Sequence, residues 1–295
     1  MTGQSAAKDI AVRESTISEL ALPYRGTFGA PRPAALARLA LPPASMPSRH
    51  ALRPLKAWRY VGVFGPELML CLATARIGVA RQAIWAVWDR DSGRLYQRTT
   101  FRGGAVRLDR GRARLRDRRV ELDLRLEETD GIETVCASGR GYAWTRKQGG
   151  IRARGTIELG GSRRTVDARA VIDDTAAYYE RHTRWRWSAG VGESREGQAL
   201  AWNLVSGVND PLTHSERTVW IDGRPAEVGP STFAADLSGV DGLRFCGEAT
   251  RERHENLLLV RSSYRQPFGT FSGELPGGVQ LAEGYGVMEE HDVWW

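Results

Sequence analysis

The sequence predicts an all-β protein built from two antiparallel β units that follow one another along the chain. Short apolar or alternating segments are separated by turn residues about every 8–12 residues, a spacing typical of barrels and sandwiches. After residue 50 no convincing helix of ten residues occurs, and only 175–180 has a weak helical pattern. A Gly-rich hairpin pattern at 155–161 is repeated at 273–278, about half the chain later.

The first 50 residues differ from the remainder. Residues 30–47 are rich in Ala and Leu and contain five prolines, which interrupt regular helices and strands. We therefore expect an irregular lead-in over 1–50, with one short helix at 34–41.

The first β unit is expected over 51–165. The aromatic and β-branched run 58–64 predicts a strand. Residues 83–101 predict a hairpin around the turn residues 89–93. Strict alternation of apolar and charged residues at 120–127 predicts a strand with one buried and one exposed face. Further strands are expected at 132–137, 142–146 and 156–159.

The second β unit is expected over 166–295, with a boundary between the units near 164–173. Asp222-Gly223 has the composition of a hairpin turn. The strand-like segments of this half are 185–191, 199–206, 217–221, 245–250, 257–261 and 284–289.

Composition excludes several classes of protein. The hydrophobic fraction of 41% and charged fraction of 26% are those of a globular chain, not a disordered one. No window approaches about 18 consecutive apolar residues, so we expect no membrane insertion. Three widely spaced cysteines argue against a disulfide framework and against a CxxC-type metal site, and they favour a cytoplasmic location.

The charge is unevenly distributed. Residues 1–165 contain 30 Lys and Arg against 15 Asp and Glu, whereas 166–295 contain 12 against 20. Four of the eight arginines within 102–119 alternate, at positions 112, 114, 116 and 118, and would line one face of a strand. Such a stripe is able to bind an anionic surface or nucleic acid. The alternative is a solvated face, because only three of the 42 basic residues are Lys and no aromatic residue interleaves the run.

Five short motifs follow one another in the second half of the chain: DDTAAYYERHTRWRW at 173–187, NLVSG at 203–207, VWIDG at 219–223, FGTFSG at 268–273 and GYGVMEEH at 284–291. This ordered set resembles the uncharacterised bacterial family DUF2804. The resemblance extends from Trp58 to the C-terminus, and it departs from the family at Glu216-Arg217, where we expect Glu-Asn. A more distant resemblance is to the AttH and carotenoid 1,2-hydratase group.

The resemblance to the second group implies two lipocalin-like β-barrels in tandem. Some members of that group bind apolar isoprenoid or polyketide substrates and hydrate or cyclise them without a cofactor. This likeness supports the architecture more directly than the reaction.

Asp173 and Asp174 are the candidate general acids. Adjacent residues of a strand point to opposite faces, so only one of them can enter a given pocket. An apolar pocket would raise the pKa of that carboxyl and suit it to donate a proton, whereas a contacting cation would prevent this. The alternative is that one of them caps a helix at 175–180. His182 is the candidate proton carrier beside them, although a lone His is more often a surface residue.

Trp185 and Trp187 are the candidate floor of a ligand cavity. Their spacing of two places both rings on one face of a strand, where they serve equally well as core. Asn203 and Trp220, from the family motifs, are further candidates for ligand contact.

Glu289 and His291 are the remaining candidates for ligand contact. We expect one of them to point inward and pair with an Arg in a buried polar network. The other four histidines have no ligand spacing with His291, so no metal site is expected.

The function predicted from these observations is binding of an apolar or amphipathic small molecule in a cavity. The first alternative is a cofactor-free hydratase, isomerase or cyclase that uses Asp173 or Asp174 as the acid. The second alternative is an anionic-surface or nucleic-acid binder acting through 102–119. A cavity with a buried carboxyl group would favour the enzyme over the carrier.

Overall fold

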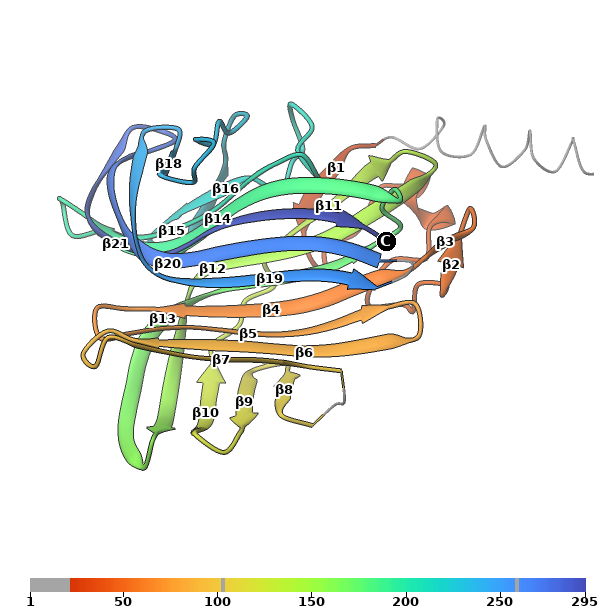
Figure 1. The fold of residues 1–295 in the computed structure, drawn as a ribbon. Helices are drawn as coiled ribbons and strands as arrows, with labels where there is room; N and C mark the ends of the chain where they lie inside the picture. The colour runs from red at the N-terminus through yellow and green to blue at the C-terminus, as the bar shows by residue number, and fades with distance from the viewer. Residues whose placement is uncertain (1–21, 102–103, 258–259) are drawn as a thin grey trace, which may run out of the picture.

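Two large antiparallel sheets make up the protein. The structure, a computed structural model, describes residues 22–101, 104–257 and 260–295. It contains an 11-stranded and an 8-stranded sheet, together with a small sheet of β2 (Arg49–His50) and β3 (Arg53–Pro54) (Figure 1). Among the described residues the helical content is a single 3-10 turn, η1 (Ala34–Arg38). The all-β prediction is confirmed.

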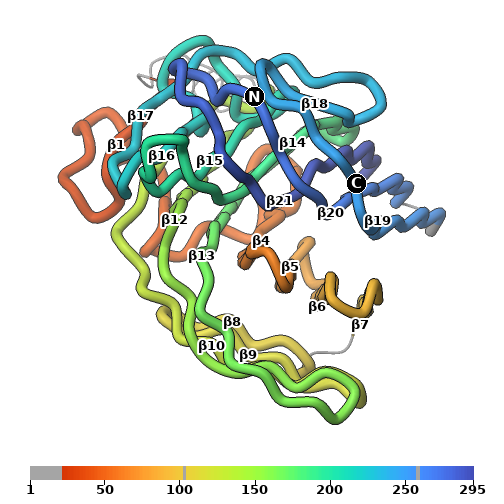
Figure 2. The backbone as a smooth tube through the Cα atoms, turned by 90° about the vertical axis from the view of Figure 1, so that its left-hand side faces the viewer, coloured from red at the N-terminus to blue at the C-terminus, as the bar shows by residue number. Residues whose placement is uncertain are grey.

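The first sheet rolls around its own apolar core. Its strand order is β7-β6-β5-β4-β13-β12-β10-β9-β8, and β8 packs against β5 and β6 across the roll (Figure 2). The core includes Val61, Leu72, Leu122 and Ile172, all fully buried. The strands are β4 (Lys56–Phe64), β5 (Leu68–Ile77), β6 (Ala80–Asp89), β7 (Arg94–Thr100), β8 (Val106–Asp109), β9 (Arg112–Arg116), β10 (Val120–Leu126), β12 (Gly141–Leu159) and β13 (Ser162–Ala177).

The second sheet curls over a separate core in the C-terminal half. Its strand order is β17-β16-β15-β14-β21-β20-β19-β18, and its core includes Trp202, Leu243 and Met288. The strands are β14 (His182–Ser194), β15 (Ala199–Ser206), β16 (Thr218–Ile221), β17 (Arg224–Glu227), β18 (Gly239–Val240), β19 (Leu243–Leu257), β20 (Val260–Leu275) and β21 (Val279–Trp294).

The change from one sheet to the other occurs at 178–181. The boundary expected at 165/166 falls inside β13, which pairs with β12 and β4 of the first sheet. The helix suggested at 175–180 is absent from the structure, because β13 continues to Ala177 and pairs there with Lys56. Tertiary pairing overrides the local preference, as is usual for short segments.

The lead-in is less irregular than expected. Its first 21 residues lie outside the described part of the chain. Beyond them, β1 (Tyr24–Thr27) pairs with β11 (Ile132–Ser138), which in turn pairs with β12. Leu36, within the short helix expected at 34–41, is buried against Tyr142 and Trp144.

A third core lies between the two sheets and determines where the site is found. Tyr60 and Val171 contribute from the first sheet, and Trp187 and Phe268 from the second. The strands β4 and β5 therefore lie against β14, β20 and β21, as Figure 2 shows. The cleft described below lies in this core, between the two sheets.

One bulge in β12 brings the sheets together. The register of β12 against β13 shifts between Gln148 and Ile151, at Gly149-Gly150. A Cβ on Gly149 would lie 2.4 Å from Cε3 of Trp220, so only glycine permits this approach. Trp220, a candidate ligand contact, thus packs on the bulge and does not line the cleft.

Candidate active site

The candidate site is a cleft of about 170 Å³ in the core between the sheets. Its aromatic wall is built by three rings from both halves of the chain. Trp58 stacks on Trp185 with centroids 6.2 Å apart and planes inclined by 10°, and on Tyr179 at 6.0 Å and 25°. Flat π surfaces of this kind bind apolar groups and stabilise nearby positive charge.

Trp185 and Trp187 both face the cleft, as their spacing predicts. Trp187 is 5% exposed and donates its Nε1 hydrogen to Asn203 Oδ1 at 2.8 Å. Trp185 is half-buried and donates to Glu289 Oε1 at 2.8 Å. Asn203 does not line the cleft; it orients Trp187 and itself donates to the Glu216 carbonyl at 2.9 Å. Asn203 therefore acts on the cleft through Trp187.

Asp173 and Asp174 point to opposite faces of β13, and Asp173 is the one that faces the cleft. Its Oδ1 lies 2.6 Å from Lys147 Nζ and accepts a hydrogen bond from Thr175 at 2.8 Å. Its Oδ2 accepts a bond from Trp58 Nε1 at 3.1 Å. The cation that would prevent Asp173 from donating a proton is thus present as Lys147, its cross-strand partner on β12.

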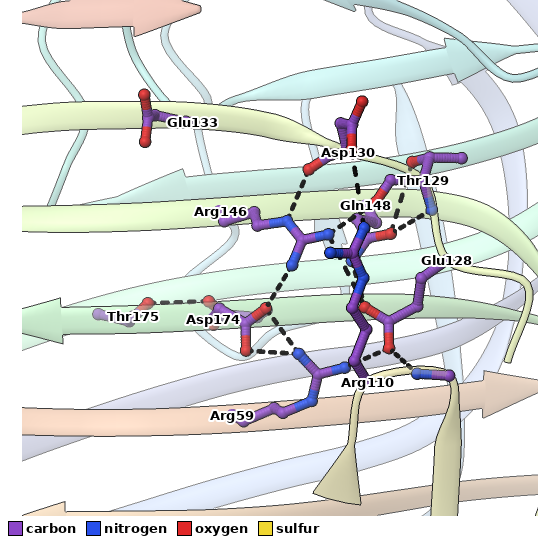
Figure 3. Close-up of polar contacts among 12 residues, drawn as sticks. Arg59, Arg110, Glu128, Thr129, Asp130, Glu133, Arg146, Gln148, Asp174 and Thr175 are labelled. Carbon is purple, nitrogen blue, oxygen red and sulfur yellow. Dashed lines mark hydrogen bonds and ion pairs between the residues drawn. The ribbon is translucent and has the colours of Figure 1, made fainter. Parts of the chain in front are cut away.

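Asp174 lies inside the roll of the first sheet, away from the cleft. Arg59 binds both of its carboxylate oxygens, at 2.9 and 2.8 Å, and also binds Glu128 at 2.6 Å. Arg146 lies 3.7 Å from Asp174 and donates to backbone carbonyls of residues 129 and 130 (Figure 3). Burial raises the pKa of Asp174, while Arg59 opposes this shift. Asp174 belongs to a structural ion-pair network.

Lys147 and Glu216 are site residues that the sequence analysis missed. Glu216 lies 3.2 Å from Lys147 Nζ, so two carboxylates share one buried ammonium. Burial alone would lower the pKa of Lys147, but Asp173 and Glu216 together raise it. Burial raises the pKa of Glu216, and the Lys147 charge opposes this. The one available signal was that Lys147 is among only three lysines in an Arg-rich chain.

Glu289 is a further carboxyl group of the cleft, contributed by β21. Its Oε2 accepts hydrogen bonds from Tyr264 OH at 2.9 Å and Gln266 Nε2 at 2.8 Å, and its Oε1 accepts only the Trp185 bond. Burial raises the pKa of Glu289, against the effect of these hydrogen bonds. The expected pairing with an Arg is wrong for Glu289, and its neighbour Glu290 on the opposite face pairs with Arg184 and Arg186.

His291 points into the cleft together with Glu289, because the two residues are two positions apart on β21 and so share a face. Its Nε2 lies 2.8 Å from Ser262 Oγ, and its ring centroid is 4.4 Å from that of Trp185. Burial lowers its pKa to about 3, with a smaller contribution of the same sign from Arg251. His291 is therefore neutral at pH 7.

His182 lies outside the cleft. Its side chain is 43% exposed, its Nε2 lies 2.9 Å from Asp292, and its ring stacks on Trp294 at 4.2 Å. The β13–β14 turn carries it to the surface, so it does not contact Asp173. The structure does not bring this predicted proton carrier to the site.

Tyr60 supplies an unsatisfied hydroxyl inside the cleft. It is the cross-strand partner of Asp173 on β4 and is 7% exposed. Its buried OH has no hydrogen-bond partner among the described residues; a polar neighbour, the Cys71 thiol, is a weak hydrogen-bonding group. Burial raises the pKa of Tyr60 well above its ordinary value. A buried donor of this kind is costly unless a ligand or water satisfies it.

The Arg stripe is an ion-paired surface. Arg112, Arg114 and Arg116 lie on one face of β9, as predicted, but Arg118 lies in the bend beyond the end of the strand, so the expected stripe is one residue shorter. They pair with Asp123 at 2.6 Å, Asp109 at 2.8 Å and Glu121 at 3.3 Å, respectively. These carboxylates neutralise the stripe and do not favour binding of an anionic surface.

Across the described ranges, no cluster of three or more His, Cys, Asp or Glu side chains is arranged to hold a metal ion. Within the same ranges, no helix has the length and apolar character needed to cross a membrane.

A family model named DUF2804, a domain of unknown function, matches residues 102–295. The chain belongs to this family. The resemblance expected from sequence is confirmed, although the matched range begins at 102 and not at Trp58. No curated protein matches the chain.

Solved structures of similar architecture include a putative AttH from Nitrosomonas europaea, with a TM-score of 0.47, 13% identity, and coverage of 85% of this chain and 98% of the other. Kievitone hydratase from Nectria haematococca has a TM-score of 0.49, 12% identity, and coverage of 81% and 89%. CghA has a TM-score of 0.40, 10% identity, and coverage of 92% and 97%. At these values the similarities carry no information about activity.

Proposed function

We propose that the cleft binds an apolar or amphipathic small molecule, and that the protein is a cofactor-free acid–base enzyme acting on it as a hydratase, isomerase or cyclase. The observation that carries this proposal is that buried carboxyl groups, among them Glu289 and Asp173, line an aromatic cleft. A carrier would need the cleft but not the buried carboxyl groups, whose desolvation is unfavourable. The cytoplasm is the proposed location, which suits the unpaired cysteines.

Glu289 is the proposed general acid, in place of Asp173 and Asp174. Its raised pKa favours the protonated form that a general acid needs. Its Oε1 accepts one hydrogen bond while Oε2 accepts two, so Oε1 has room to carry that proton. Asp173, bound to the Lys147 ammonium, is the proposed anionic partner.

The proposed step is protonation of a substrate double bond. The Glu289 O–H bond breaks and its proton forms a C–H bond with the substrate π electrons, which leaves a cation on the neighbouring carbon. The faces of Trp58 and Trp185 and the charge of Asp173 stabilise that cation. Addition of water, with its proton returned to a carboxylate, gives hydration; loss of another proton gives an isomer.

The experiment is incubation of the protein with a panel of short amphipathic alkenes in D2O, with products analysed by mass spectrometry. Deuterium incorporation by the wild type is expected to fall by about 10²–10⁴-fold in Glu289→Gln, while binding of the same alkenes is retained. Glu290→Gln is the matched control, because Glu290 is adjacent but faces the other side of β21. Undiminished incorporation by Glu289→Gln would overturn the assignment. Binding without any incorporation by the wild type would favour a carrier.

The cleft volume favours a small ligand. About 170 Å³ is below the roughly 300–1,000 Å³ of pockets that hold drug-sized molecules. A short-chain or monocyclic molecule suits this space better than a long isoprenoid or a polycyclic polyketide.

A further inference from the structure

Arg251 on β19 is a buried cation in the cleft that has no carboxylate partner. It lines the cleft and is 3% exposed. Its Nη2 donates to Thr99 Oγ1 of β7 at 2.6 Å, and its guanidinium lies 5.0 Å from the centroid of the Tyr264 ring. Among the described residues, no Asp or Glu lies within ion-pair distance of it, and the Thr99 bond uses only one of its N–H donors.

The other cations lining the cleft are neutralised. Lys147 is bound by Asp173 and Glu216. Arg253, two residues from Arg251 on the same face of β19, pairs with Glu255. The two arginines thus share strand, face and chemistry, whereas Arg253 is more exposed and is accompanied by a carboxylate.

The positive charge of Arg251 acts on the cleft. It contributes to lowering the pKa of His291, and it opposes the burial-induced rise in the pKa of Cys71 and of Tyr264. An arginine held in a desolvated site without a counter-ion is costly, and an anion would relieve that cost. The guanidinium is also the side chain best suited to bind a carboxylate through two parallel hydrogen bonds.

We propose that the ligand of the cleft is an amphipathic carboxylate whose anionic group pairs with Arg251 and whose apolar part lies against Trp58 and Trp185. This inference rests on the proposed function and defines its substrate class. Tyr264 links the two sites, since its ring lies beneath Arg251 and its OH donates to Glu289 at 2.9 Å. The ligand carboxylate is therefore separated from Glu289 by about the length of one tyrosine side chain. The reacting group of the substrate accordingly lies near the charged end of the molecule.

The test compares octanoate with octan-1-ol by isothermal titration calorimetry, because the two share a chain and differ in charge. The wild type is expected to bind octanoate at least about tenfold more tightly than the alcohol. Arg251→Gln is expected to abolish this preference while leaving the alcohol affinity within about twofold. The double variant Arg253→Gln/Glu255→Gln, the matched control, is expected to keep the preference because it removes a neutral ion pair and leaves no unpaired charge.

The outcomes separate this inference from the proposed function. Equal affinity for acid and alcohol in the wild type would overturn the anionic substrate class alone and leave the cleft as a binding site. An equal loss of preference in both arginine variants would also overturn the role of Arg251. Binding of neither probe would overturn this inference and the cleft as a ligand site together. The wild-type comparison decides the question even if Arg251→Gln does not fold.

Discussion

Trp58 of the first sheet and Trp185 of the second lie face to face, with their ring centroids 6.2 Å apart. Each indole also donates a hydrogen bond to a carboxyl group of the cleft, Trp58 to Asp173 and Trp185 to Glu289. The stack therefore connects the two proposed ionisable partners through rigid aromatic groups. Preorganisation of this kind keeps charged groups in fixed positions without the cost of reordering them.

The two tryptophans of β14 are expected to differ in their contribution to stability. Trp187→Ala removes a 5% exposed ring and its bond to Asn203, and is expected to lower the free energy of unfolding by about 3–5 kcal/mol. Trp185→Ala removes a half-buried ring and is expected to cost less. Urea denaturation of both variants measures the difference, and a larger loss for Trp185→Ala would contradict it.

Removal of the shared ammonium is expected to be strongly destabilising. Lys147→Met leaves Asp173 and Glu216 buried without a cation, so the free energy of unfolding should fall by about 3–5 kcal/mol at pH 7. Adding Glu216→Gln to Lys147→Met removes one of the stranded charges and should restore part of the loss. Denaturant unfolding of the single and double variants tests this, and a double variant no more stable than the single would count against it.

Glu289 is expected to make stability depend on pH. Its folded pKa is raised above the ordinary value of 4.5, so the folded state holds a proton that the unfolded state releases. Stability from this group is fully present below pH 4.5 and is lost as pH rises through the folded pKa. Glu289→Gln should therefore gain stability relative to the wild type between pH 4 and pH 8. A constant difference across this range, measured by urea unfolding, would refute the shift.

His291 is expected to have the opposite effect. Its folded pKa of about 3 is below the ordinary 6.5, so the unfolded state binds a proton first as pH falls. Its contribution is present above pH 6.5 and is lost progressively toward pH 3, by several kcal/mol in total. His291→Asn should lose less stability than the wild type between pH 7 and pH 4. The exposed His182→Asn is the control and should follow the wild type in the same unfolding series.

The two aspartates of β13 are expected to separate stability from ligand binding. Asp174→Asn weakens the pairs with Arg59 and Arg146 and should lower stability by about 1–3 kcal/mol. Its effect on ligand affinity should be within about twofold, because Asp174 faces the interior of the first sheet. Asp173→Asn should change affinity or turnover. Calorimetric binding and denaturant unfolding of both variants measure these effects, and a stronger binding defect in Asp174→Asn would reverse the assignment.

Local sequence patterns predicted the fold class because period-two alternation determines which side chains of a strand share a face. They placed Trp185 with Trp187 correctly, and they showed that only one of Asp173 and Asp174 can enter the cleft. They did not place Lys147 beside Asp173, because that contact depends on the register of β12 against β13, a long-range property. Glu216 and Arg251 were missed for a similar reason: both reach the cleft only once the two sheets pack together.

The expectation for His182 failed because proximity in sequence was taken as proximity in space. The last four residues of β13 and the connection 178–181 separate Asp173 from His182. The chain leaves the first sheet along this stretch and enters the second at its surface. This change of sheet, at 178–181, falls within a motif that is continuous in sequence.

The proposed acid and its anionic partner are carried by different sheets, Glu289 on β21 and Asp173 on β13. The distance between Glu289 and Asp173 therefore depends on how the two sheets pack. Buried residues between the sheets, such as Phe64 and Phe268, act as spacers that set this packing. A change in spacer volume alters the separation of the reacting groups without altering either group. Substitutions at such spacers would thus change which ligands fit between the proposed acid and its partner without touching the ligand.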